Sequence, residues 1–108
     1  MMSYKKALFI GSKSLGLSVL KALRTVKSQC LQHIMTIDDR NDSRSVYEEF
    51  HDYAQTESLS IVTAKNKLDV TKYIQSSGFD ICFVCGWYWL LDRKTLDAVP
   101  GGFVGIHN

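Results

Sequence analysis

Short apolar runs alternate along this chain with segments whose apolar residues recur at helical spacing. Five runs fit buried strands: Ala7–Ile10, Leu31–Ile37, Leu59–Thr63, Asp80–Cys85 and Phe103–His107. Runs of this length that are apolar throughout are typical of parallel strands covered on both faces. We therefore predict five strands, most of them parallel.

The segments between these runs predict helices. From Ser14 to Val26, leucines and valines recur every three or four residues and form one apolar stripe. A second helix is marked by Val46, Phe50 and Tyr53, with Ser43 as its predicted cap. A third helix opens at Asn66 or Asp69 and stops at Gly78, and a short fourth one covers Leu91 to Leu96.

Alternating strands and helices predict an α/β fold, a doubly wound, Rossmann-like and mainly parallel five-stranded sheet with flanking helices. Parallel strands end on one edge, where such sheets bind ligands. Three loops are expected at that edge: Gly11 to Gly16, Asp38 to Arg44 and Gly86 to Leu91. The pattern stops just after the fifth strand without a closing helix, so we expect the single domain, residues 1–108, to be C-terminally incomplete.

Composition narrows the class of protein. Its 108 residues carry a net charge of +2 and are 45% hydrophobic, which excludes a disordered chain and gives no basic surface for nucleic acid. The longest apolar run, Ile81 to Leu91, is much shorter than the about 20 residues of a membrane span. An odd number of cysteines, three, argues against a disulfide framework and favours the cytoplasm.

The first loop, GSKSLG at Gly11 to Gly16, follows a strand and opens a helix. Its N–H groups are placed to receive an anion, but Lys13 occupies the middle position where the dinucleotide fingerprint needs a glycine. A ligand contact by Lys13 and a plain strand-to-helix turn both remain open. Asp38 ends the second strand, where a nicotinamide enzyme holds ribose, yet the broken glycine pattern favours a solvated loop there.

Cys82 and Cys85 form a CxxC pair. A zinc or redox pair needs its two sulfurs to converge in a turn or at a helix N-terminus. In a strand, positions three apart face opposite sides of the sheet. We therefore interpret both residues as buried core cysteines and predict no metal site.

The segment GWYWLLDRKTLDAVPGGFVGIHN carries the strongest functional signal. The aromatic residues of Gly86 to Leu91 follow the fourth strand and can form a wall for a planar ligand. His107 closes the fifth strand on the same edge, where an imidazole suits proton transfer near neutral pH. A histidine that merely ends a strand is the alternative.

This segment resembles the N-terminal half of the folate-dependent formyltransferases, which act on glycinamide ribonucleotide, methionyl-tRNA or sugar nucleotides. The family pattern is an apolar strand, a glycine, a bulky stretch ending in Ile/Leu-Leu, a short helix, and then N-x-H. Here these parts are DICFVC, Gly86, WYWLL and G-I-H, with matching spacing. The opening LFIGSKSLGLSVLKAL is similar to the family's first strand and helix, and GWYWLL is most similar to the sugar N-formyltransferases.

The resemblance implies roles for individual residues. His107 falls on the catalytic histidine. Gly86, Tyr88, Trp89, Leu90 and Leu91 fall where the family binds the pterin ring of N10-formyltetrahydrofolate through backbone groups. Gly11, Ser12 and Lys13 fall on a loop near the acceptor's phosphates. The implied acceptor is a primary amine of a nucleotide-linked amino sugar.

One position departs from the family. Gly105 stands where the family has an asparagine that stabilises the oxyanion, and loss of one such donor typically costs about 10²–10³ in rate. The family's downstream catalytic aspartate lies beyond residue 108, so we expect this chain alone to be inactive. The alternative function is a non-catalytic, Rossmann-like module that binds a nucleotide or acts by association.

The resemblance also bears on assembly. In the family, a later strand inserts between those that correspond to Asp80–Cys85 and Phe103–His107. Without it, the two strands either pair directly or leave an apolar edge. We expect a homo-oligomer.

Overall fold

A computed structural model describes residues 4–106, and the elements alternate as the sequence predicts. They are β1 (Ala7–Gly11), α1 (Lys13–Lys27), β2 (Leu31–Thr36), α2 (Tyr47–Glu57), β3 (Ser60–Thr63), α3 (Lys67–Ser77), β4 (Ile81–Cys85), α4 (Arg93–Asp97) and β5 (Phe103–Ile106).

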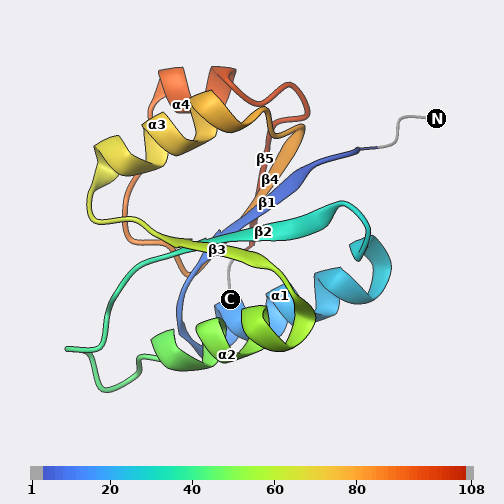
Figure 1. The fold of residues 1–108 in the computed structure, drawn as a ribbon. Helices are drawn as coiled ribbons and strands as arrows, with labels where there is room; N and C mark the ends of the chain where they lie inside the picture. Colours follow the sequence, from blue (N-terminus) through green and yellow to red (C-terminus); the bar gives the residue numbers. More distant parts are fainter. Residues whose placement is uncertain (1–3, 107–108) are drawn as a thin grey trace.

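The strands form one sheet in the order β3-β2-β1-β4-β5 (Figure 1). All four neighbouring pairs are parallel. The chain moves outward from β1 to β3, then crosses back to β4 beside β1. This order confirms the predicted Rossmann-like α/β fold, and it makes the carboxyl ends of β1 and β4 the point where the strand order reverses.

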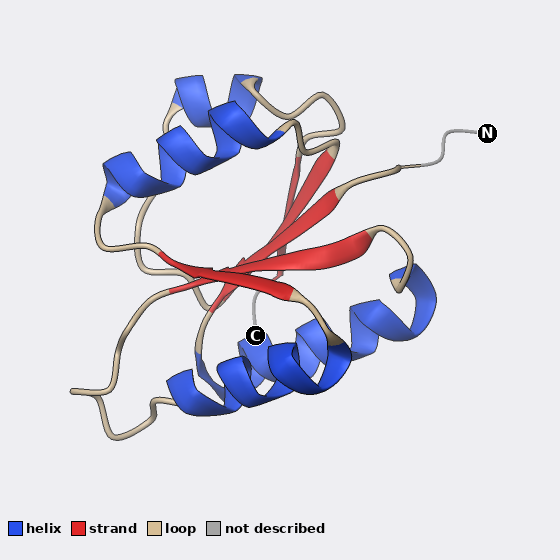
Figure 2. Ribbon diagram, viewed as in Figure 1, coloured by secondary structure: helices blue, strands red, loops and turns tan. Residues whose placement is uncertain are grey.

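Helices cover both faces of the sheet (Figure 2). On one face, α1 and α2 bury Leu20 and Phe50 against Phe9 of β1. On the other face, α3 buries Val70 and Ile74 in a second cluster with Leu8, Ile10 and Phe79. Successive residues of β1 thus enter opposite cores, which explains why the strand is apolar throughout.

The CxxC pair divides between these two cores. Cys82 belongs to the cluster under α3, and Cys85 belongs to the cluster under α1 and α2. This confirms that the two side chains face opposite sides of the sheet. Burial raises the pKa of the Cys82 thiol to about 12, so it stays protonated at neutral pH.

The helix boundaries follow local capping chemistry. Asn66, one of the two predicted starts, caps α3 by accepting a hydrogen bond from the Asp69 N–H. Gly78 ends that helix as predicted, in the left-handed conformation at φ +69°. The predicted cap at Ser43 is wrong, because α2 begins only at Tyr47. There the Ser45 hydroxyl accepts a hydrogen bond from the Tyr47 N–H at 3.2 Å.

The fifth strand pairs directly with the fourth, with Phe83 opposite Val104 and Cys85 opposite Ile106. Among the described residues, β5 has no second neighbour and forms an outer strand of the sheet. None of the helices in residues 4–106 is both long and apolar enough to cross a membrane.

Candidate functional site at the carboxyl edge of the sheet

The loops after β1 and β4 contact each other at the point where the strand order reverses. The Ser12 N–H donates to the Cys85 carbonyl at 3.3 Å, and the Ser12 hydroxyl donates to the Gly86 carbonyl. Ser12 itself is buried. The predicted acceptor loop and the predicted donor loop are therefore joined by hydrogen bonds.

Two glycines permit this close approach. A Cβ on Gly11 would overlap the Cys85 carbonyl oxygen, and a Cβ on Gly86 would lie 2.5 Å from the Ser12 carbonyl oxygen. Gly86 also has φ +68°, where residues with a side chain are strained. Glycine at both positions is thus required by contact between the loops, whatever ligand they hold.

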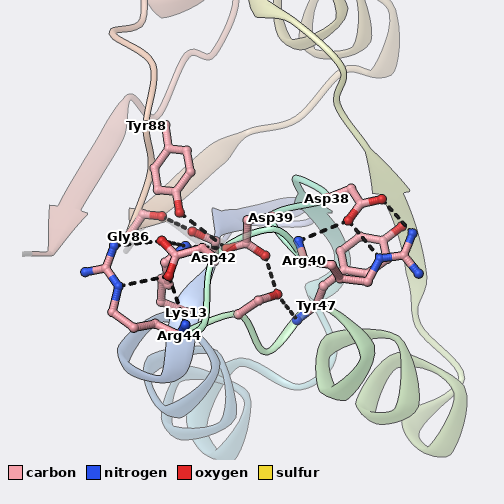
Figure 3. A network of polar contacts seen from close by, with 11 residues as sticks. Lys13, Asp38, Asp39, Arg40, Asp42, Arg44, Tyr47, Gly86 and Tyr88 are labelled. Carbon is pink, nitrogen blue, oxygen red and sulfur yellow. Dashed lines mark hydrogen bonds and ion pairs between the residues drawn. The ribbon is translucent and has the colours of Figure 1, made fainter.

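Lys13 occupies the middle position of the first loop with φ +66°. A backbone in this left-handed region is rare for a residue with a Cβ. Its ammonium group forms an ion pair with Asp39 and lies 3.6 Å from a carboxylate oxygen of Asp42 (Figure 3). The side chain thus reaches across the sheet edge to the loop after β2.

Asp39 is the centre of this polar network. It is only 4% exposed, and besides Lys13 it accepts hydrogen bonds from the Ser45 hydroxyl at 2.6 Å and the Tyr88 hydroxyl at 3.4 Å. The Lys13 ammonium also lies 4.5 Å from the centre of the Tyr88 ring, within range of a cation–π contact. One buried carboxylate therefore links the three predicted loops.

Sequence analysis did not select Asp39. Its neighbours Asp38 and Asp42 lie in the same polar run, and no local signal distinguishes the buried aspartate from these two more accessible ones. A usable clue was Lys13, a charged residue at a glycine position, which needs a partner if its side chain turns inward.

Asp38 and Asp42 each form an ion pair with the arginine two positions further along the chain. The Asp38 carboxylate accepts from Arg40 Nε at 2.8 Å and Nη2 at 2.6 Å, and this arginine lowers the pKa of Asp38 to about 2. Asp42 pairs with Arg44 in the same way, and its pKa is also lowered, mainly by that hydrogen bond. Both carboxylates are therefore ionised at neutral pH.

The residues that follow Gly86 form a feature that we call the aromatic bend, Trp87–Leu91. Trp87 and Trp89 pack against the core under α3 with their rings edge to face, 5.5 Å apart. Tyr88 and Leu90 are 49% and 85% exposed. Within residues 4–106, the N–H and C=O groups of the bend make no hydrogen bond to another backbone group.

The aromatic bend and β5 enclose a cavity of about 390 Å³, which we call the bend cavity. Of the residues predicted to bind the formyl donor, Gly86, Trp89, Leu90 and Leu91 line it. Tyr88 is absent from this lining, because its hydroxyl turns toward Asp39 on the other side of the bend.

The last residues of β5, Gly105 and Ile106, also line the bend cavity. The predicted catalytic residue, His107, lies outside the described residues. Gly11, Ser12 and Lys13 are not among the lining residues, although Ser12 contacts the bend cavity's rim at Gly86. Leu15, one turn further along α1, lines the bend cavity instead.

A second cavity of about 580 Å³ lies beyond the ends of β2 and β3, and we call it the β2–β3 cavity. Trp89 lines both cavities and separates them. The other walls of the β2–β3 cavity include Asp38, Asp39, Tyr47 and Tyr88. Residues 4–106 contain no cluster of three or more His, Cys, Asp or Glu side chains able to hold a metal ion.

The fold and this edge define a doubly wound α/β protein with two adjoining cavities at the carboxyl edge of its sheet. Comparison with family models and with curated proteins gave no match to the sequence. A proposal for its function therefore rests on the residues and their geometry.

Proposed function

We propose that this chain is the N-terminal part of the catalytic domain of a folate-dependent formyltransferase. The reaction moves a formyl group from N10-formyltetrahydrofolate to a primary amine, with a nucleotide-linked amino sugar as the acceptor. The proposal rests on the resemblance of GWYWLL and its spacing to G-I-H, together with the geometry of the bend cavity.

One observation carries the proposal: the aromatic bend has backbone groups without backbone partners among the described residues, and four of its five residues line the bend cavity. Backbone groups of this kind are normally paired where they are buried, and where they are exposed they are open to water or a ligand. A pterin is planar and carries several donors and acceptors along its edge, so it suits both these groups and the tryptophan rings. The size of the bend cavity, about 390 Å³, is within the usual range for small ligands.

The acceptor loop borders this cavity through the contact between Ser12 and Gly86. Lys13 is already neutralised by Asp39 and Asp42, so the phosphate contact proposed for this loop falls to N–H groups. The first turn of α1 supplies N–H groups that no helix carbonyl accepts.

N10-formyltetrahydrofolate, when bound, supplies the formyl carbon. The acceptor nitrogen forms a new bond to that carbon as the carbon's bond to N10 breaks. His107 is proposed to take the proton that the amine loses and to return it to N10, so that atoms and charge balance. Gly105 provides no side-chain donor for the oxyanion, which predicts slow transfer.

Tryptophan fluorescence offers a direct test of donor binding. Trp87 and Trp89 are the two tryptophans of the chain and both line the bend cavity. We expect tetrahydrofolate to quench their emission saturably. Leu90→Glu, which adds a charge at this cavity, should weaken binding at least tenfold, whereas Val26→Glu on exposed α1 surface should leave it unchanged.

Absence of saturable quenching by tetrahydrofolate and N10-formyltetrahydrofolate would contradict the proposal. Binding of nucleotides without any binding of folates would instead indicate the non-catalytic nucleotide-binding module. Cys30, Cys82 and Cys85 are unpaired, which supports the proposal that the protein works in the reducing cytoplasm. The outer position of β5 supports the proposal of a homo-oligomer.

A further inference from the structure

The β2–β3 cavity has a wall of aromatic rings and a wall of carboxylates. Tyr88 and Trp89 reach it from the aromatic bend, and Asp38 and Asp39 reach it from the end of β2. Figure 3 shows Tyr88 and the two aspartates, which come from different loops and lie around this edge of the sheet. The mechanism above uses none of these side chains.

The two aspartates in this cavity already have cationic partners, and Lys65 adds one positive charge to the lining. Arg40 matches Asp38, and Lys13 matches Asp39. A cation would have to displace one of these partners, and an anion would meet two carboxylates. The ligand portion that fits beside the two aspartates is therefore uncharged and polar.

Counting donors shows what kind of polar group the aspartates can still bind. Asp38 accepts three hydrogen bonds, all from Arg40. Asp39 also accepts three, from Lys13, Ser45 and Tyr88. A carboxylate has about four acceptor positions, so each aspartate has room for one further donor. Single positions on two consecutive residues match the two hydroxyls of a vicinal diol.

The opposite wall suits a planar ring. Tyr88 is half exposed, with its ring held by the Lys13 ammonium and its hydroxyl by Asp39. Trp89 continues this wall, and the apolar side chains of Ile37 and Ala64 complete the lining between the two walls. Aromatic rings fixed in this way stack well on a heterocycle.

We propose that the β2–β3 cavity binds a nucleoside, with its base against Tyr88 and Trp89 and its ribose hydroxyls donating to Asp38 and Asp39. The volume, about 580 Å³, is in the usual range for small-ligand sites. The position also agrees, because the end of the second strand is where doubly wound sheets bind ribose. The proposed acceptor also contains a nucleoside, but this site does not rest on the proposed function, because its binding requires neither a formyl donor nor an acceptor amine.

The test is a titration of the ¹⁵N-labelled chain with adenosine and uridine, each compared with its 2′,3′-dideoxy form. We expect saturable binding of at least one ribonucleoside, with amide shifts centred on residues 63–65 and 88–89. The dideoxy form should bind about 100-fold more weakly. It lacks two hydrogen bonds to carboxylates, and the loss of each should reduce the affinity about tenfold.

Asp38→Ala should weaken ribonucleoside binding about tenfold and reduce the preference over the dideoxy form to about tenfold. Asp97→Ala is the matched control, because Asp97 is also an exposed aspartate paired with an arginine but lies on α4. It should leave both values unchanged. Equal binding of the ribose and dideoxy forms, shifts elsewhere in the chain, or no saturation by either nucleoside would overturn the proposal.

These outcomes are separable from those of the folate titration. Folate quenching without nucleoside binding would remove only the nucleoside site. Nucleoside binding without folate quenching would remove only the formyltransferase proposal.

Discussion

Lys13 carries a side chain at a backbone position that a glycine would adopt without strain. Its φ of +66° lies in the left-handed region, and its ion pair with buried Asp39 holds the side chain inward. The residue that breaks the dinucleotide fingerprint is therefore the one that ties the first loop to the second. The sequence left open whether Lys13 contacts a ligand or lies in a plain turn, and it did not predict the contact with Asp39.

The strain and the ion pair at Lys13 can be separated by two substitutions. Lys13→Ala removes the ion pair and keeps the strained backbone, whereas Lys13→Gly removes both. We expect Lys13→Gly to be more stable than Lys13→Ala by about 1 kcal/mol. Urea unfolding of the two variants measures this difference, and a more stable alanine variant would show that the backbone is not strained.

Asp39 was not selected from the sequence, but we expect it to contribute substantially to the stability of the fold. Asp39→Asn leaves the Lys13 ammonium with only the more distant Asp42 carboxylate, at a site where water is largely excluded. We expect a loss of about 2 kcal/mol in the free energy of unfolding. Ser45→Ala is the comparison; it removes one neutral donor to Asp39 and the acceptor of the Tyr47 N–H, and it should cost about 1 kcal/mol. Equal stability of Asp39→Asn and the wild type would contradict the role assigned to the network.

The Asp38–Arg40 pair predicts a pH dependence. The pKa of Asp38 is about 2 in the folded chain, against about 3.9 for an unfolded aspartate. The folded chain therefore binds fewer protons between these values, so the pair stabilises the fold above about pH 4 and loses this contribution as the pH falls toward 2. Arg40→Gln should raise the pKa of Asp38 toward its ordinary value, which carboxyl ¹³C NMR would follow. An unchanged pKa in that variant would assign the shift to another group.

At the scale of elements, two glycines that flank β4 show separately what backbone conformation and close packing require. Gly78 precedes the strand, and Gly86 follows it where the loops after β1 and β4 touch. Gly78 and Gly86 have nearly the same positive φ, +69° and +68°. They differ in surroundings, because a Cβ on Gly78 would meet nothing within 4 Å and one on Gly86 would meet the Ser12 backbone. The effects of backbone conformation and of close packing on stability can therefore be compared in one chain.

We expect Gly78→Ala to cost about 1 kcal/mol of stability, from the left-handed backbone alone. Gly86→Ala should cost at least about 3 kcal/mol, because β4 and the first loop must also move apart. Thermal or urea unfolding of the two variants provides the measurement. Similar losses would show that the loops can separate easily and that the site is not rigid.

The elements that sequence patterns located well are those whose signals are local. The apolar stripe of α1, the Asn66 cap and the Gly78 stop each depend on neighbouring residues. The start of α2 was misplaced because Ser45 and Asp39 are engaged in a tertiary network that fixes the preceding loop. A serine a few residues before an apolar stripe, such as Ser43, is therefore not enough to predict where a helix begins.

At the scale of the whole molecule, β5 pairs directly with β4 and presents its other edge outward. None of its four residues is charged, and Val104 is 41% exposed. Charged side chains on an outer strand normally discourage pairing between copies. This edge therefore supports the proposed association of the chain with itself.

Sedimentation at micromolar concentration tests that association. We expect the wild type to sediment as a dimer or larger species and Val104→Lys to sediment as a monomer, because a charge on the outer strand opposes strand pairing. Val26→Lys places the same charge on the exposed surface of α1 and should preserve the assembly. A monomeric wild type would refute the proposal.

The sequence by itself determined the class of fold. Apolar runs alternating with helical stripes require strands covered on both faces, and right-handed crossovers then bring the strand ends to one edge. It also placed Gly86, Trp89 and Leu91 beside one another, because they are close in the chain.

Only the tertiary structure decided which distant residues meet at that edge. Asp39 is buried while Asp38 is exposed, and Tyr88 turns away from the cavity that its neighbours line. Hydrophobic periodicity reports which face of an element is covered, but it contains no information about side chains that pair across loops. Those contacts depend on the three-dimensional distances between β1, β2 and β4, which are set by the packing of the whole sheet.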